Sequence, residues 1–242
     1  GDLVGAISDF DQAIALDPQD ALIYNNRGSA RADQGDIVGA ISDYDQAIAL
    51  DPKMAVAYVS RGFARSGQGD LVGAISDFDQ AIALDPKMAV AYYNRGRARH
   101  KQREMAGAIS DFDQAIALDP QVAQAYNGRG NARNEQGDLV GAISDFDQAI
   151  ALDPNMASAY YGRGVTRYDQ GDLSGAINDF DQVIALTPQN ADAYLWRGFA
   201  RNRQGDVAGA IDDLTRYLEL APNAADRAAV EQAIADLTNA NK

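Results

Sequence analysis

The sequence GDLVGAISDFDQAIALDP occupies residues 1–18 and recurs without a change at residues 69–86 and 137–154. Close variants halve the spacing from 68 to 34 residues, and they stand at residues 35–52, 103–120, 171–188 and 205–222. A fixed period of this length is typical of an array in which one small unit of secondary structure stacks on copies of itself. The sequence therefore predicts a repeat protein.

Each period is expected to form two helices. Residues 21–34 have the length of a helix, Gly35 suits the left-handed residue that closes one, and Asp36 can cap the next. Apolar residues at three-and-four spacing continue to Leu50. Pro52 then stops the second helix, because proline lacks an amide donor. An antiparallel helix pair is predicted, in which small residues allow close approach at Gly28, Ala40 and Ala47.

The period divides the chain into three parts. We expect a half repeat with only a second helix at residues 1–20, six full repeats at 21–224, and a capping helix with its tail at 225–242. Within the tail, residues 226–237 form an amphipathic pattern that would cover the last repeat. Because the chain starts at a second helix, two interpretations stay open: truncation of a longer protein, or stacking of another copy on this end.

The repeat resembles that of the tetratricopeptide repeat family, in the form of a bacterial-type tandem array. The family motif of aromatic, Gly, Ala, aromatic, Ala and Pro is matched in the second full repeat by Tyr58, Gly62, Ala74, Phe78, Ala81 and Pro86. The resemblance covers residues 1–224. It implies an all-α, right-handed superhelical solenoid whose concave groove binds peptides or protein segments, and it does not identify the ligand.

Composition excludes several classes of function. The 242 residues carry 21 basic and 35 acidic side chains, a net charge of -14, which disfavours nucleic acid or an anionic membrane as partner. No apolar run is long enough to span a membrane. The chain has no cysteine, and His100 is its one histidine, so thiol chemistry and a two-histidine metal site are excluded. We therefore expect no enzyme, no metal and no cofactor.

In all six full repeats an arginine stands directly before the motif glycine, where the family usually has leucine. A second arginine follows four residues after the first. The twelve arginines share one helix face, and they are Arg27, Arg31, Arg61, Arg65, Arg95, Arg99, Arg129, Arg133, Arg163, Arg167, Arg197 and Arg201. Second helices carry acids to match, such as Asp77 and Asp79. A structural ladder of Arg–Asp pairs is the favoured interpretation, and an anion-binding stripe is the alternative.

The turn of the third full repeat departs from the pattern. Arg103 and Glu104 replace the usual Gly and Asp, so we expect this turn to be less sharply fixed. Residues 97–103 are also the densest basic stretch of the chain. This stretch is either a solvated turn or a basic spot in an acidic array.

Positions that vary between repeats indicate where a ligand would bind, and in the family these positions of the first helices line the groove. The second full repeat offers an apolar patch there, Val56, Val59 and Phe63. The candidate site is predicted from later repeats: Tyr93, Arg97, His100 and Lys101 for acidic or carbonyl groups, Asn127, Asn131 and Asn134 for peptide backbone, and Tyr161 and Tyr168 as apolar flanks. Alternatively, individual aromatic residues pack against neighbouring helices.

A non-catalytic scaffold that holds a protein or peptide segment is the favoured function. A clamp for chaperone tails is not expected, because none of the positions that carry its lysines is basic here. The alternative is a structural protein that self-assembles into homo-oligomers through its ends. Binding of single-stranded RNA is disfavoured by the net charge of -14.

Overall fold

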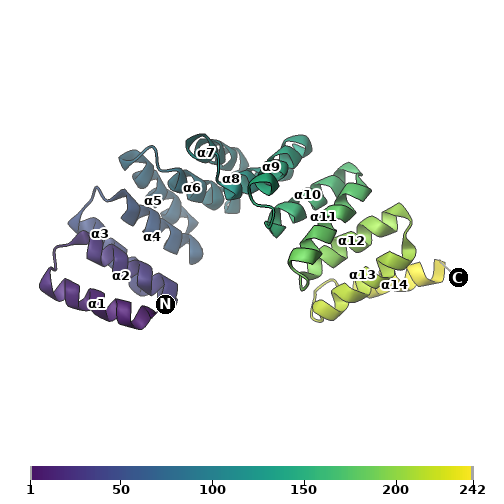
Figure 1. Ribbon diagram of the computed structural model, residues 1–242, viewed down its shortest axis with the longest axis horizontal. Helices are drawn as coiled ribbons and strands as arrows, with labels where there is room; N and C mark the ends of the chain where they lie inside the picture. The colour runs from purple at the N-terminus through teal and green to yellow at the C-terminus, as the bar shows by residue number, and fades with distance from the viewer. Residues whose placement is uncertain (1, 241–242) are drawn as a thin grey trace. The chain divides into compact units, whose positions relative to one another are not determined.

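The computed structural model describes residues 2–240, and this part of the chain consists of fourteen α-helices without a strand (Figure 1). The all-α prediction is thereby confirmed. The helix bounds are α1 Leu3–Leu16, α2 Ala21–Gln34, α3 Ile37–Leu50, α4 Ala55–Gly67, α5 Leu71–Leu84, α6 Ala89–Lys101, α7 Met105–Leu118, α8 Ala123–Glu135, α9 Leu139–Leu152, α10 Ala157–Gln170, α11 Leu173–Leu186, α12 Ala191–Gln204, α13 Val207–Leu220 and α14 Arg227–Ala240.

The chain forms two compact units, Gly1–Pro120 with α1 to α7 and Gln121–Lys242 with α8 to α14. Inside each unit the two helices of a repeat pack together, as α2 does with α3 and α8 with α9. The first helices of successive repeats also touch, α2 with α4 and α4 with α6 in one unit, and α8 with α10 and α10 with α12 in the other. One face of each unit is therefore built from first helices.

The turns follow from capping residues. Gly35 ends α2 with a φ of 92°, in the left-handed region that glycine adopts without strain. Asp36 then caps α3, because its Oδ1 accepts a hydrogen bond of 2.9 Å from the amide of Gly39. The second helix ends at Leu50, before Asp51 and Pro52, as the sequence predicts.

The interior of each repeat is built from one aromatic ring and several alanines. Phe78 is fully buried, and so are Ala74 and Ala81 on the same helix. Gly62 on α4 faces this ring so closely that a Cβ atom there would lie 2.8 Å from Phe78 Cε1 and 3.1 Å from the Ala74 carbonyl oxygen. The expected role of the small residues in helix pairing is confirmed.

The arginines form a ladder with buried aspartates. In the second full repeat, Asp77 is 2% exposed and accepts bonds of 3.0 and 2.5 Å from Arg61 and of 2.9 Å from Arg65. Arg61 also donates to Asp45 of the preceding repeat at 2.6 Å. Similar groups surround buried aspartates in the other full repeats, at Asp43, Asp111, Asp145, Asp179 and Asp213. The arginines therefore connect helices, as the structural interpretation predicts.

The turn between α6 and α7 follows the same path as its counterparts. Glu104 N donates to the Arg99 carbonyl oxygen at 2.9 Å, as Asp70 N does to that of Arg65 at 3.0 Å. Arg103 takes a φ of 65°, which is unusual for a residue with a side chain. Glu104 makes no side-chain capping bond. The lost cap is thus confirmed, while the backbone hydrogen bonds of the turn are kept.

The helix α14 covers the end of the second unit. Val230 is buried against Leu214 and Tyr217 of α13, with Ile234 and Leu237 packed beside them. Tyr217 donates a hydrogen bond of 2.5 Å to Asp226, just before α14. The last repeat is adapted to this helix, since Leu214 and Tyr217 stand where other repeats have an aromatic residue and alanine or valine.

Candidate functional site

A cavity of about 540 Å³ opens where α2, α4 and α6 lie next to one another in the first unit. Three successive repeats contribute to it, each mainly through its first helix. The lining residues are Ser29, Ala32, Asp33, Ile37, Tyr44, Val59, Ser60, Phe63, Ala64, Gly67, Val90, Tyr93, Asn94 and Arg97. Most of them are apolar or aromatic, which is typical of a site that binds a large apolar group with a few polar contacts.

Phe63 is the most prominent apolar group of the cavity. This α4 side chain is 58% exposed, although phenylalanine is usually buried. Val90 on α6 is also 49% exposed, whereas Val59, one turn before Phe63, is 9% exposed. The cavity thus presents apolar surface to solvent that a ligand can cover.

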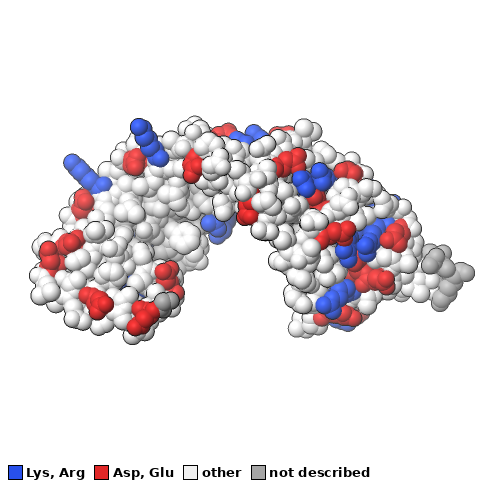
Figure 2. Space-filling model, in the orientation of Figure 1, with Lys and Arg blue, Asp and Glu red and all other residues white. Residues whose placement is uncertain are grey.

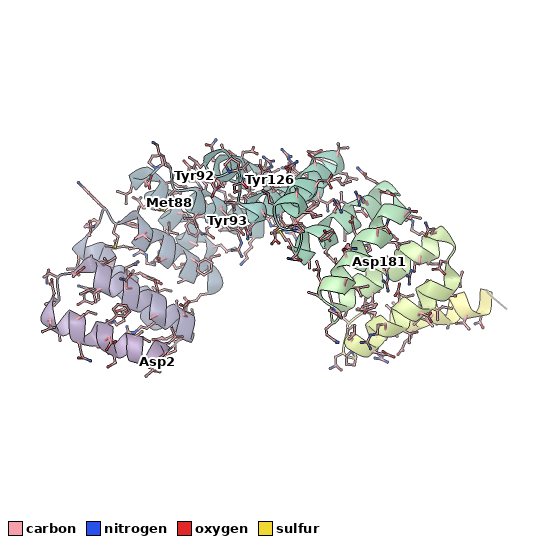
Figure 3. The ribbon with its side chains drawn as sticks, in the orientation of Figure 1. Asp2, Met88, Tyr92, Tyr93, Tyr126 and Asp181 are labelled. Carbon is pink, nitrogen blue, oxygen red and sulfur yellow. The ribbon has the colours of Figure 1, made fainter. Side chains whose placement is uncertain are left out.

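The side of the cavity formed by α6 is basic. The Arg97 guanidinium lies over the Tyr93 ring at 5.6 Å, and this ring contacts Phe112 with centroids 6.1 Å apart. Figure 3 shows Tyr93 leaving α6 on a different side from Tyr92, which stacks on the ladder residue Arg95. The Tyr93 ring therefore holds Arg97 on the cavity face.

A second cavity of about 110 Å³ adjoins the first. It shares Phe63, Gly67, Asn94 and Arg97 with the larger cavity, and it adds Ser66, Phe78 and Lys101. Arg97 and Lys101 are exposed, and within residues 2–240 neither forms an ion pair. In the ladder, by contrast, Arg95 and Arg99 of the same helix both bind Asp111. In Figure 2 a basic group lies at the edge of the largely uncharged area over α4.

The opposite side of the cavity, formed by α2 and α3, is acidic and polar. Asp33 is exposed and, in the described part of the chain, has no ion pair. Tyr44 donates a hydrogen bond of 3.4 Å to Ser29 Oγ. Burial raises the pKa of Tyr44 above its ordinary value, although the bond to Ser29 acts in the other direction. The phenol therefore stays neutral near pH 7 and remains a donor.

The structure places four candidate residues on α6. Tyr93 and Arg97 line the larger cavity, and Arg97 and Lys101 line the smaller one. His100 is half-buried in the last turn of α6 and lines neither cavity. Three of these four residues are thus brought together at cavities, as groove residues would be.

The other five candidates lie in the second unit, on α8 and α10. Asn127, Asn131 and Asn134 are half-buried on α8, and the Oδ1 atoms of Asn127 and Asn134 are buried without a hydrogen-bond partner among the described residues. The Tyr161 ring packs against Phe180, with centroids 6.1 Å apart. Burial raises the pKa of Tyr161.

Tyr168 belongs to an aromatic cluster. Its ring meets Trp196 edge to face at 5.4 Å, and Trp196 meets Phe199 at 6.2 Å. The Arg203 guanidinium lies 4.5 Å from the centre of the Tyr168 ring. The Tyr168 ring on α10 thus contacts α12 through Trp196, and its role as an apolar flank stays a prediction.

Phe63 and Asp33 also line the cavity, although neither belongs to the candidate site residues. Variation between repeats already predicts Phe63 as part of an apolar patch at the groove positions. Phe63, Arg97 and Asn131 occupy the same place in successive repeats, 34 residues apart. The register that selects Arg97 and Asn131 therefore also selects Phe63.

No cluster of metal-binding side chains occurs among the residues that the structure describes. Across residues 2–240, no helix is both long and apolar enough to cross a membrane.

The comparisons with known proteins agree on the repeat. A family model described as tetratricopeptide repeat matches residues 61–122 and 161–225. A second model, described as TPR repeat, matches residues 1–35, 28–69 and 130–171. No curated protein matches the chain in sequence.

Many solved structures are similar, 412 chains in all. YrrB, described as a TPR protein with an unusual peptide-binding site, is 25% identical with a TM-score of 0.62, over 76% of this chain and 95% of that one. The PilF protein of Pseudomonas aeruginosa is 17% identical with a TM-score of 0.79, over 89% and 98%. A chain of the APC/C hetero-tetramer Cut9-Hcn1 is 17% identical with a TM-score of 0.81, over 97% of this chain and 46% of that chain. The present chain thus spans less than half of that relative, and the latter two likenesses concern the fold alone.

Proposed function

The chain belongs to the tetratricopeptide repeat family, and from this premise we propose that it is a non-catalytic scaffold that holds an extended peptide segment of a partner protein. The observation that carries the proposal is the cavity of about 540 Å³ across three successive first helices. The peptide-binding site named for YrrB supports it, since that protein is 25% identical to this chain.

The candidate residues take the following roles in this proposal. On α6, Tyr93, Arg97, His100 and Lys101 contact acidic or carbonyl groups of the segment. In the second unit, Asn127, Asn131 and Asn134 bind peptide backbone, because an amide side chain can both donate and accept. Tyr161 and Tyr168 are apolar flanks.

A scaffold role without catalysis is supported by the use of the charged residues. The recurring aspartates that might serve as acid–base pairs are held by the ladder, as Asp77 is by Arg61 and Arg65. Both carboxylate oxygens of Asp77 are occupied by these arginines, so they are not open to a substrate. No histidine other than His100 is present to relay a proton.

Selection from a random peptide display library tests the proposal. We expect the chain to enrich peptides whose affinity falls at least tenfold with Phe63→Ala or Tyr93→Ala, because each change removes apolar contact area. The matched control is Val72→Ala, since Val72 is 74% exposed on the second helix α5. Circular dichroism checks that all variants stay folded. Failure to enrich any peptide, or equal loss of affinity in the control, would contradict the proposal.

Self-assembly through the ends is the second candidate. On α1, Leu16 is 88% exposed, whereas its counterparts Leu84 and Leu118 are each 39% exposed, and no residue of this helix is fully buried among those described. A second copy that stacks there would cover Leu16. Light scattering at rising protein concentration tests this candidate, and a constant monomer mass would exclude it.

A further inference from the structure

We infer that the partner segment carries a large apolar side chain between two opposite charges: a carboxylate on the side of α6 and a cationic group on the side of α2. This inference rests on the proposed function, and it adds the chemistry and the order of the groups that the cavity recognises. It is carried by Phe63, Arg97, Lys101 and Asp33.

The order of the groups follows from the order of the helices. The helix α4 touches both α2 and α6. Asp33 on α2, Phe63 on α4 and Arg97 on α6 line the same cavity. The apolar Phe63 therefore stands between the acidic and the basic side chain.

The charges are available to a ligand. Arg97 and Asp33 are exposed and belong to no ion pair in the described part of the chain, although the net charge is -14. In the ladder, even the exposed Asp79 is paired, with Arg95 at 2.6 Å. Lys101 and Arg97 both line the adjoining cavity, so two cations are available to the carboxylate of the ligand. Arg97 and Lys101 do not stand at the positions where a chaperone-tail clamp carries its lysines. Those positions hold no basic residue in this chain.

The spacing of the helices sets the spacing in the peptide. Packed helices lie about 8–10 Å apart. A peptide in the polyproline II conformation, which is common in unfolded chains, advances about 3.1 Å per residue and returns every third side chain to the same face. Each charge therefore lies about three residues from the apolar side chain. The carboxylate belongs either to an Asp or Glu side chain or to the C-terminus of the peptide.

Synthetic nine-residue peptides with a fluorescent label test this inference by fluorescence anisotropy. The first has a central Phe with Lys three residues before it and Glu three residues after it, and its ends are blocked. The second has the charges exchanged, so that it covers the opposite chain direction. A third carries Gln at both places, and a fourth replaces Glu by a free C-terminal carboxylate at the same distance.

We expect one of the two charge orders to bind about fivefold or more tightly than the Gln peptide, since two partly exposed ion pairs form. Replacement of the central Phe by Ala is expected to weaken binding about tenfold. The fourth peptide distinguishes the source of the carboxylate. If the fourth peptide binds better than the blocked peptide with Glu, the recognised carboxylate is a chain terminus. Otherwise it is an Asp or Glu side chain.

Charge reversal in the protein gives a sharper result. With Arg97→Glu, the Glu of the preferred peptide is repelled, and exchange of that Glu for Lys is expected to restore affinity. Lys87→Glu is the matched control, because Lys87 is exposed, precedes α6 and lines neither cavity. Equal affinity for charged and Gln peptides, absence of binding by every peptide, or the same effect of the control would overturn the inference. The proposed function is decided separately by the display selection, which assumes no charge order.

Discussion

Two aspartates of one helix, two residues apart, differ in their surroundings. Asp77 on α5 is 2% exposed and binds Arg61 and Arg65, whereas the side chain of Asp79 is 48% exposed and, among the described residues, binds Arg95 alone. Removal of the Asp77 charge takes the buried partner from both arginines, and it leaves Arg61 with Asp45 at 2.6 Å and Arg65 with Asp70 at 4.0 Å. An exposed ion pair contributes little, because water and salt screen it.

Asp77→Asn is therefore expected to destabilise the protein by about 2–4 kcal/mol. Asp79→Asn is expected to cost less than about 1 kcal/mol. Urea denaturation followed by circular dichroism measures both, as shifts of the midpoint, because repeat arrays need not unfold in one step. Equal shifts would show that burial of Asp77 does not determine its contribution.

Gly62 and Gly67 lie on the same helix α4, but replacing each by alanine is expected to change stability in opposite directions. A Cβ at Gly62 would meet the Ala74 backbone at 3.1 Å and the Phe78 ring at 2.8 Å, while a Cβ at Gly67 would meet nothing within 4 Å. Gly62→Ala is expected to cost about 1–3 kcal/mol through overpacking. Gly67→Ala is expected to stabilise by up to about 1 kcal/mol through helix propensity. Thermal unfolding compares the two, and a stabilising Gly62→Ala would contradict the close packing.

Among the elements, the start of α7 lacks the cap that its counterparts have. Asp70 accepts a bond of 2.9 Å from the Gly73 amide at the start of α5, and Glu104 makes no such bond at the start of α7. Glu104→Asp is expected to stabilise α7 by about 1 kcal/mol, and Asp70→Glu to destabilise α5 by a similar amount. Hydrogen exchange of the first-turn amides of each helix measures the change locally. Unchanged protection in both variants would contradict the capping role.

The contact between α13 and α14 is expected to make the folding stability of the protein fall at alkaline pH. The hydrogen bond to Asp226 and burial raise the pKa of Tyr217 to about 12, above the ordinary value of 10. The folded state then holds this proton more tightly than the unfolded state does. The contribution of Tyr217 to stability is complete below pH 10 and is lost as the pH rises from about 10 to about 12.

Tyr217→Phe removes this titration. We expect the variant to lose less stability than the wild type between about pH 10 and pH 12, although it is less stable at pH 8 because the bond to Asp226 is gone. Unfolding midpoints across this range measure the difference. Parallel curves for the two proteins would mean that Tyr217 does not titrate differently in the folded state.

In the molecule as a whole, acidic charge is in excess. The net charge is -14, and ladder arginines such as Arg61 and Arg65 are engaged by aspartates. Salt screens the repulsion between exposed carboxylates more than it weakens the ladder, because the central aspartates are buried. The thermal midpoint is therefore expected to rise when NaCl is increased from about 10 mM to about 150 mM. A fall would show that exposed ion pairs dominate the electrostatic stability.

The repeat, the helix pairs and the ladder can be predicted from the amino-acid sequence. Each of these depends on residues within one period or its neighbour, such as Gly62 against Phe78 or Arg61 beside Asp77, and the period repeats them in register. Variation between repeats also predicts Tyr93, Arg97 and Lys101 as residues of the groove. Tertiary structure alone decided that Asp33, Phe63 and Arg97 line one cavity. The reason is that three helices, each separated from the next along the chain by a second helix, must pack side by side before their exposed side chains can meet.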